Sequence, residues 1–315
     1  MPRYSFHFMI AGVAALAVAT FSTSALAQNE AVEYIATPLS GTLTMIKGRG
    51  GNIAVSAGED GLYIIDDQLE PLTDQLLVAI SKISDQPIRF VINTHYHGDH
   101  VGGNEQIGKA GAVIIAHDNI HKRMSSDQFS HFWNKTTPAW PAGSLPVISF
   151  NDRVTLRFNG EEATVYHVPN GHTDGDSIVH FPASNVIHMG DIYFNGLYPF
   201  IDLDGGGGIQ GMIAGTELAL SMADAETQII PGHGPLSDRK SLVQYQDFLL
   251  RARDNVQALV DQDKSLEQAI EARPTAEWDA LLGEVWITPD QLVTFIYNSL
   301  KGIHHFTRLE SSESE

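Results

Sequence analysis

The sequence contains no cysteine among its 315 residues. This absence excludes disulfide bonds, structural zinc held by thiolates, iron–sulfur clusters and a thiol nucleophile. The hydrophobic content of 43% is ordinary for a globular protein, so the fold has to be stabilised by burial of apolar surface.

Basic residues are also scarce. Lysine and arginine number 19 against 38 aspartates and glutamates, which gives a formal net charge of −19. Because so acidic a surface repels phosphate backbones and anionic lipids, we expect neither nucleic acid nor a membrane surface as a partner. After the N-terminal segment no apolar run is long enough to span a bilayer. The expected partner is a small-molecule substrate, and the sequence gives no oligomeric state.

The first 27 residues have the pattern of a cleavable export signal. Arg3 and the terminal amine supply positive charge, residues 8–19 form an apolar run, and Ala25-Leu26-Ala27 offers the small residues that a signal peptidase reads. The alternative is an uncleaved anchor, which needs about 20 apolar residues. We expect cleavage after Ala27 and a mature protein that is periplasmic or secreted.

The pattern of apolar residues predicts alternating strands and helices. Strands are expected at residues 43–46, 53–57, 62–66, 88–92, 113–116, 154–158, 163–168, 177–181, 186–189 and 227–230. Helices are expected after Pro71, around Glu105, over 209–222 and from Leu242 onward. Two halves that each combine strands and helices indicate an α/β sandwich with helices outside. We divide the chain into a signal peptide (1–27), an α/β domain (28–240) and a C-terminal helical extension packed on that domain (241–315).

Four of the expected strands run into short polar turns that contain histidine or aspartate. The turns are HYHGDH, GHTDGD, GD and GHG, and their candidate metal ligands are His95, His97, Asp99, His100, His172, Asp191 and His233. Sites in α/β folds form where neighbouring strands end, so residues far apart in sequence can meet there. A single His-x-His pair is common, but four such turns at strand ends indicate one metal centre.

These residue types suit a pair of divalent cations. Imidazole favours zinc, and a carboxylate between two cations can bridge them. Two ions roughly 3.5–4 Å apart can share a water and lower its pKa toward about 7, which makes a nucleophile without serine or cysteine. We therefore expect two Zn²⁺ ions, with iron and manganese as alternatives.

The four motifs together resemble the metallo-β-lactamase superfamily, and the resemblance extends to about Gly234. It implies a four-layer αββα sandwich, here with extra C-terminal helices. It also implies that His95, His97 and His172 bind the first metal, and that Asp99, His100 and His233 bind the second. Asp191 would bridge both metals, and Asp99 and Asp191 would have the catalytic role of orienting the metal-bound hydroxide.

The residues at two positions indicate which branch of this superfamily the chain resembles. The best-known β-lactamases have cysteine at the position of Asp191 and a substrate-binding lysine at that of Phe194. Aspartate at the first position resembles thioesterases of the glyoxalase II type and lactonases. We expect an exported dinuclear zinc hydrolase of a small lactam, lactone, ester or thioester, with β-lactamase activity as its main or a side reaction. A glyoxalase-II-like thioesterase or lactonase is the first alternative, followed by a di-iron redox protein and a non-enzymatic metal-binding protein.

Aromatic residues in two segments are candidates for substrate contact. Residues 128–146 are expected to form an irregular loop, and a second loop follows Asp191. The candidates from these loops are Trp133, Trp140, Tyr193, Asn195, Tyr198 and Phe200. Large apolar rings line ligand pockets, but they also anchor long loops on a core, and the sequence leaves both roles open.

Overall fold

The computed structural model describes residues 32–283 and 285–309. These residues belong to one compact unit that begins at residue 31. The expected signal peptide and its cleavage site lie outside the described residues, so export stays a prediction. Among the helices of the described residues, none combines the length and the apolar character needed to cross a membrane.

The first of two large sheets has seven strands. Their spatial order is β1(Ile35–Pro38), β2(Leu43–Lys47), β3(Ile53–Gly58), β4(Gly61–Ile65), β5(Ile88–Ile92), β6(Val113–His117) and β9(Ile148–Phe150). The strands from β1 to β4 pair antiparallel, whereas β4, β5, β6 and β9 pair parallel to one another. The carboxyl ends of the parallel strands therefore meet at one edge, where β5 runs into the HYHGDH turn.

The second large sheet has six strands from the later part of the chain. Their order is β10(Arg153–Phe158), β11(Glu161–His167), β12(Ser177–Phe181), β13(Val186–His188), β14(Gln228–Ile230) and β15(Ser237–Asp238). All neighbours pair antiparallel except β13 and β14, which pair parallel. The 128–146 segment is more regular than expected, because it contains the hairpin β7(Gln128–Ser130) and β8(Lys135–Thr137).

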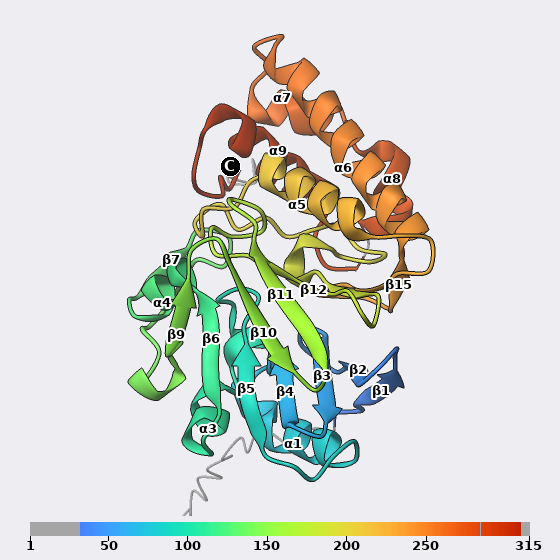
Figure 1. The fold of residues 1–315 in the computed structure, drawn as a ribbon. Helices are drawn as coiled ribbons and strands as arrows, with labels where there is room; N and C mark the ends of the chain where they lie inside the picture. Colours follow the sequence, from blue (N-terminus) through green and yellow to red (C-terminus); the bar gives the residue numbers. More distant parts are fainter. Residues whose placement is uncertain (1–31, 284, 310–315) are drawn as a thin grey trace, which may run out of the picture. The chain divides into compact units, whose positions relative to one another are not determined.

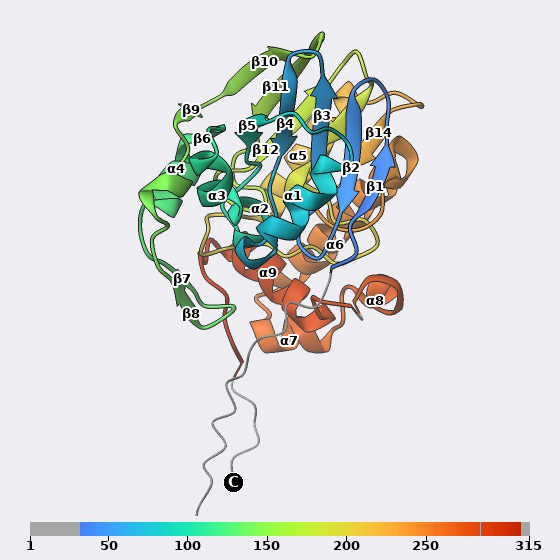
Figure 2. The same cartoon turned by 90° about the horizontal axis from the view of Figure 1, so that it is seen from below.

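The two sheets pack face to face, with helices on both outer faces (Figures 1 and 2). Alternate residues of both sheets, such as Ile65 and Ile92 from the first and Val165 and Val179 from the second, form the apolar layer between them. The outer face of the first sheet packs against α1(Thr73–Ser81) and α3(Asn104–Lys109). The outer face of the second packs against α5(Ile209–Met222), α6(Arg239–Val260) and α9(Pro289–Lys301). The fold is the expected four-layer αββα sandwich.

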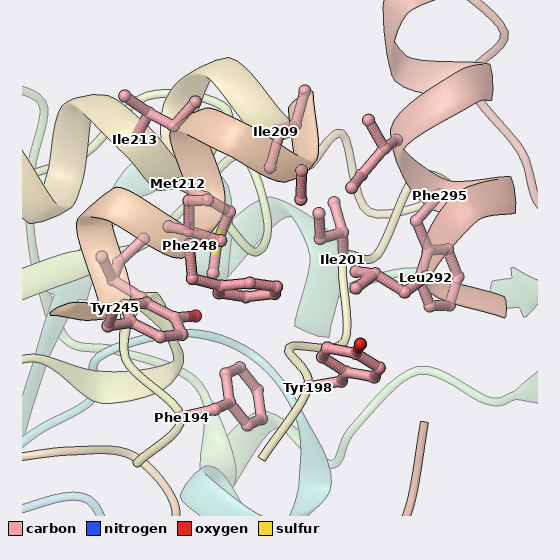
Figure 3. Close-up of a cluster of buried hydrophobic side chains, with 14 of the residues drawn as sticks. Phe194, Tyr198, Ile201, Ile209, Met212, Ile213, Tyr245, Phe248, Leu292 and Phe295 are labelled. Carbon is pink, nitrogen blue, oxygen red and sulfur yellow. The ribbon is translucent and has the colours of Figure 1, made fainter. Parts of the chain in front are cut away.

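The helices after residue 238 continue the packing of the second sheet. Figure 3 shows Tyr245 and Phe248 of α6 and Phe295 of α9 gathered with α5 side chains in one buried cluster. Asp238 caps the N-terminus of helix α6, since its side chain accepts a hydrogen bond from the Ser241 amide. The short helices α7(Leu266–Glu271) and α8(Ala276–Leu282) lie between α6 and α9 in the chain. The cluster includes residues on both sides of 240, and the domain division at that residue stays a prediction.

Candidate metal centre

The structure brings all seven candidate metal ligands together. His95 and His97 follow β5, Asp99 and His100 lie in the short helix α2(Gly98–Val101), and His172 follows β11. Asp191 lies in the 3₁₀ turn η3(Gly190–Ile192) after β13, and His233 follows β14. The seven residues form three overlapping groups whose potential ligand atoms lie within 4.8 Å of one another. Four segments that are distant in sequence therefore meet at one end of the sandwich.

The first group consists of His95, His97 and His172. His97 Nε2 lies 2.8 Å from an Asp202 carboxylate oxygen, and His172 Nδ1 lies 2.8 Å from the Phe200 carbonyl oxygen. Because each of these nitrogens donates to its oxygen, the other nitrogen of each ring faces the metal site. Those two atoms, His97 Nδ1 and His172 Nε2, are 2.8 Å apart, so one shared proton can join them. Burial lowers the pKa of His97, but Asp202 outweighs it and raises that pKa, which favours such a proton. A cation that both nitrogens bind would replace this proton.

The second group consists of Asp99, His100 and His233. Asp99 Oδ2 lies 3.3 Å from His233 Nε2 and 3.6 Å from His100 Nε2. Asp191 reaches both groups, since its Oδ1 is 3.2 Å from His100 Nε2 and its Oδ2 is 3.5 Å from His172 Nε2. One carboxylate between two sets of imidazoles is the arrangement expected for a ligand that bridges two cations.

Several buried polar atoms at this point face an oppositely charged neighbour but make no hydrogen bond within the described residues. They are Nε2 of His95, His100 and His233, and Oδ1 of Asp191. Buried polar groups in proteins are nearly always hydrogen-bonded, so a cluster of four atoms without a hydrogen bond needs an explanation. All four belong to the candidate ligand set, and bound cations would satisfy them. The nitrogen and oxygen donors present therefore fit a pair of divalent transition-metal ions.

The charges of the site also favour cations. Burial lowers the pKa of His233, but the facing Asp191 and Asp99 carboxylates outweigh it and raise that pKa to about 9. Burial raises the pKa of Asp191, but the His233, His100 and His95 imidazoles hold it well below its usual range. Asp191 is thus ionised, and without metal a proton on a neighbouring imidazole compensates its charge. A bound cation would replace that proton.

Two carboxylates that the sequence analysis missed position these histidines. Asp66 accepts hydrogen bonds at 2.7 Å from the Thr94 amide, the Thr94 hydroxyl and His100 Nδ1. Asp202 accepts hydrogen bonds from His97 Nε2 and, at 2.5 Å, from the Tyr96 hydroxyl. Such partners fix the orientation and tautomer of metal-binding imidazoles. Asp66 follows β4 directly, so the strand-end pattern used for the ligands could have found it, whereas no local signal marks Asp202.

A cavity of about 690 Å³ opens onto the metal centre and includes His97, Asp99 and Asp191 in its wall. Of the six predicted substrate contacts, Trp133, Trp140 and Phe200 line it. The Phe200 ring lies over His97, with centroids 5.8 Å apart, and its other neighbours include Trp133 at 6.2 Å. Aromatic side chains therefore extend from the metal ligands to the rim.

The other three predicted contacts, Tyr193, Asn195 and Tyr198, do not line this cavity. Tyr193 is buried and its hydroxyl lies 2.8 Å from that of Ser237. Tyr198 belongs to the cluster in Figure 3, and its hydroxyl donates to Asp279. The Asn195 side-chain amide donates to the Pro235 carbonyl, and its oxygen accepts a hydrogen bond from the Tyr193 hydroxyl. These three side chains stabilise the loop on the core.

Comparison with protein families gives one match, to a model described as the metallo-beta-lactamase superfamily, over residues 36–233. Among curated proteins, the hydroxyacylglutathione hydrolase of Hyphomonas neptunium is 29% identical over 49% of this chain and 47% of its own length. The metallo-beta-lactamase type 2 of Bacillus cereus is 23% identical over 60% of this chain and 69% of its own. The chain thus spans less than half the length of the first of these relatives.

Solved structures share the fold at low sequence identity. A metallo-beta-lactamase from Pontibacter korlensis superposes with a TM-score of 0.58 at 17% identity, over 69% of this chain and 99% of its own. A stereoselective inverting sec-alkylsulfatase from Pseudomonas sp. superposes with a TM-score of 0.61 at 15% identity. That match covers 82% of this chain and 50% of the sulfatase.

Proposed function

This chain belongs to the metallo-beta-lactamase superfamily, and we propose that it is a dinuclear zinc-dependent hydrolase of a small lactam, lactone, ester or thioester. The observation that carries the proposal is the set of four buried ligand atoms that make no hydrogen bond within the described residues, beside a substrate-sized cavity. When bound, zinc ions polarise a carbonyl and lower the pKa of a water, which supplies the nucleophile.

The residues of the chain have separate tasks in this reaction. Burial raises the pKa of Asp99, but His100 and His233 lower it below its usual range, so Asp99 is ionised. Its side chain is 29% exposed and lines the cavity, so it can accept a hydrogen bond from the attacking water. Asp191 faces imidazoles of both groups and fixes their relative positions. The aromatic side chains that line the cavity orient the apolar part of the substrate.

Two substrate classes are candidates within this proposal: a lactam, and a thioester or lactone. Relatives named metallo-beta-lactamase favour a lactam. Phe194, at the position of the usual substrate lysine, is buried and stacks on His233 at 5.4 Å, so it cannot bind a lactam carboxylate. A thioesterase or lactonase is the second candidate. Asp191 at the bridging position and the relatives named hydroxyacylglutathione hydrolase favour it.

Hydrolysis of a substrate panel tests the proposal. The panel consists of nitrocefin, a homoserine lactone, a thioester and a phosphodiester. We expect turnover of at least one of the first three, and EDTA should stop it. His95→Ala and Asp191→Ala should abolish turnover while the protein stays folded, whereas His304→Ala, which changes an exposed histidine outside the cluster, should keep it. Full activity in the first two variants would contradict the proposal.

The identity of the metal needs a separate measurement. The donors are nitrogen and oxygen atoms only, which zinc accepts but iron and manganese accept as well. We expect about two equivalents of zinc per chain by elemental analysis of the purified protein. Iron at that stoichiometry, with a colour that changes on reduction, would support the di-iron redox alternative instead.

We also propose that the protein is exported and cleaved after Ala27. Support comes from the sequence pattern of residues 1–27 alone. N-terminal sequencing of the protein recovered from the periplasm or the medium should begin at Gln28. Recovery of a chain that begins at Met1 would contradict this part of the proposal.

A further inference from the structure

Three basic side chains line the cavity of this strongly acidic protein: Arg49, Arg123 and Lys135. Arg123 is paired. Its guanidinium makes two hydrogen bonds of 2.8 Å to Asp174, a third of 3.0 Å to Gln128 and a fourth of 3.3 Å to the Asp204 carbonyl. These bonds use four of its five N–H donors, and the bidentate pair with Asp174 neutralises its charge and positions the loops that it joins.

Arg49 and Lys135 are different, because neither side chain has an ion-pair or hydrogen-bond partner within residues 32–283 and 285–309. The cavity carboxylates do not neutralise them, since each has another partner. Asp202 binds His97 and Tyr96, and Asp204 binds His131. Asp99 and Asp191 both face His233. Two basic groups therefore keep their hydrogen-bond donors available at the cavity surface.

Arg49 belongs to a turn that lies directly on the metal centre. The turn joins β2 to β3, and the amide of Gly51 donates to the Asp99 carbonyl at 3.3 Å. A Cβ atom at Gly50 would be 3.0 Å from that of Asp99, which shows how closely the turn approaches this ligand. Arg49 precedes this glycine and lines the cavity.

Lys135 belongs to the β7–β8 hairpin, which reaches the metal centre through aromatic side chains. It pairs with Ser130 across the hairpin, and Trp133 lies in the turn between the two strands. Trp133 contacts Phe200, which lies over His97. Both basic residues are thus on segments that contact metal ligands directly or through one ring.

Aromatic side chains form one part of the cavity wall. They are Phe129, Trp133, Trp140, Phe200 and Trp286, together with Tyr96. An aromatic wall favours an apolar ligand, and two unpaired basic groups favour an anionic one. The net charge of −19 would repel an anion at a distance, so recognition of an anion has to come from such local contacts.

We propose that the substrate carries a carboxylate as well as an apolar body, and that Arg49 and Lys135 bind that carboxylate. This inference rests on the proposed function, because it names the substrate class of the same site. Arg49 offers a planar pair of donors that matches a carboxylate, and Lys135 adds a second charge. The aromatic wall holds the apolar body, and the scissile bond lies between these two contacts and the metal ligands.

Binding tests this inference without any need for turnover. The probes are 3-phenylpropionate and its uncharged amide, added to the metal-loaded protein. Tryptophan fluorescence reports their binding, because three of the four tryptophans line the cavity. We expect the acid to bind at least about tenfold more tightly than the amide, and the Arg49→Gln/Lys135→Gln protein to lose about that factor. The control is Arg89→Gln/Lys82→Gln, which removes the same charge from exposed residues outside the cavity and should leave both affinities unchanged.

Equal affinity for acid and amide would overturn the inference, as would failure of both probes to bind. An acid preference that survives in the Arg49→Gln/Lys135→Gln protein would assign the carboxylate to the metals and would also overturn it. A kinetic comparison separates this result from the proposed function. With whichever panel substrate is hydrolysed, in carboxylate and amide forms, the double variant should raise KM for the carboxylate form alone and keep kcat. Absence of any hydrolysis would count against the proposed function, but not against the binding result.

Discussion

Replacing Asp202 with asparagine should weaken metal binding strongly, although the two side chains have nearly the same shape. Asp202 Oδ2 accepts hydrogen bonds from His97 Nε2 and the Tyr96 hydroxyl, and Oδ1 accepts one from the Gly205 amide. Asparagine has only one oxygen. If the NH2 group takes the place of Oδ1, it faces the amide donor of Gly205. If it takes the place of Oδ2, it faces the donors of His97 and Tyr96.

The size of the effect follows from this geometry. If the amide group faces His97, the ring loses its acceptor, and a hydrogen bond to a charged group contributes about 1.5–3 kcal/mol. Loss of such outer partners lowers metal affinity about 10–100-fold, which corresponds to about 1.4–2.8 kcal/mol. The first range is the free energy of one hydrogen bond and the second is a loss of metal affinity, and the two ranges overlap. We expect an affinity loss within this range at the first site.

Competition with a fluorescent zinc chelator measures this affinity directly. Tyr96→Phe removes one of the bonds to Asp202 without adding a donor, so its loss should be at most about threefold. Asp204→Asn is the matched control, because Asp204 is also a cavity carboxylate bonded to a histidine, His131, that is not a candidate ligand. If Asp202→Asn bound zinc as tightly as Asp204→Asn, our account of how Asp202 positions His97 would be refuted.

Other predictions follow from the same structure. Chelation should lower the thermal unfolding midpoint, because metal present at about a hundredfold excess over Kd adds about 2.7 kcal/mol to the free energy of unfolding. Calorimetry with and without EDTA measures the midpoint, and an unchanged midpoint would contradict the metal site. Gly232→Ala should lower both metal content and thermal stability, because its Cβ would overlap Asp191 Oδ1 and the Gly190 carbonyl; full metal content by elemental analysis would disprove this. Trp133→Ala should raise KM about tenfold, because this side chain lines the cavity. It should change stability in urea little, because the side chain is 54% exposed. An unchanged KM would show that Trp133 does not contact the substrate. Phe248→Ala should cost about 3–5 kcal/mol in urea unfolding, since the ring is buried among α5, α6 and α9; a loss below about 1 kcal/mol would contradict that packing.

Much of the strand pattern could be predicted from local sequence. The expected strands at 88–92 and 177–181 coincide with β5 and β12 because apolar, β-branched runs between turns have few other stable conformations. The hairpin within 128–146 was missed. Its strands have only three residues each, and they are mostly polar and exposed, so they leave no hydrophobic alternation to detect.

The aromatic residues show where local pattern is insufficient. Phe200 and Tyr198 are two residues apart in the same loop, yet Phe200 lines the cavity and Tyr198 donates to Asp279 in the core. Burial of an aromatic ring is favourable in either place, so the residue type does not decide between them. The difference depends on α8, which contributes Asp279, and on the loop carrying Trp286, which closes the cavity beside Phe200.

The sequence by itself determined which side chains could bind metal, because short turns at strand ends fix the spacing of His95, His97, Asp99 and His100 within one segment. Only the tertiary structure decided how those side chains are aimed. Asp202 and His97 are 105 residues apart in sequence, and Asp66 and His100 are 34 apart. A hydrogen bond requires atoms within about 3 Å, and no local periodicity specifies which distant loop supplies the partner. For the same reason, only the folded structure shows that Arg49 and Lys135, which belong to separate loops, line one cavity.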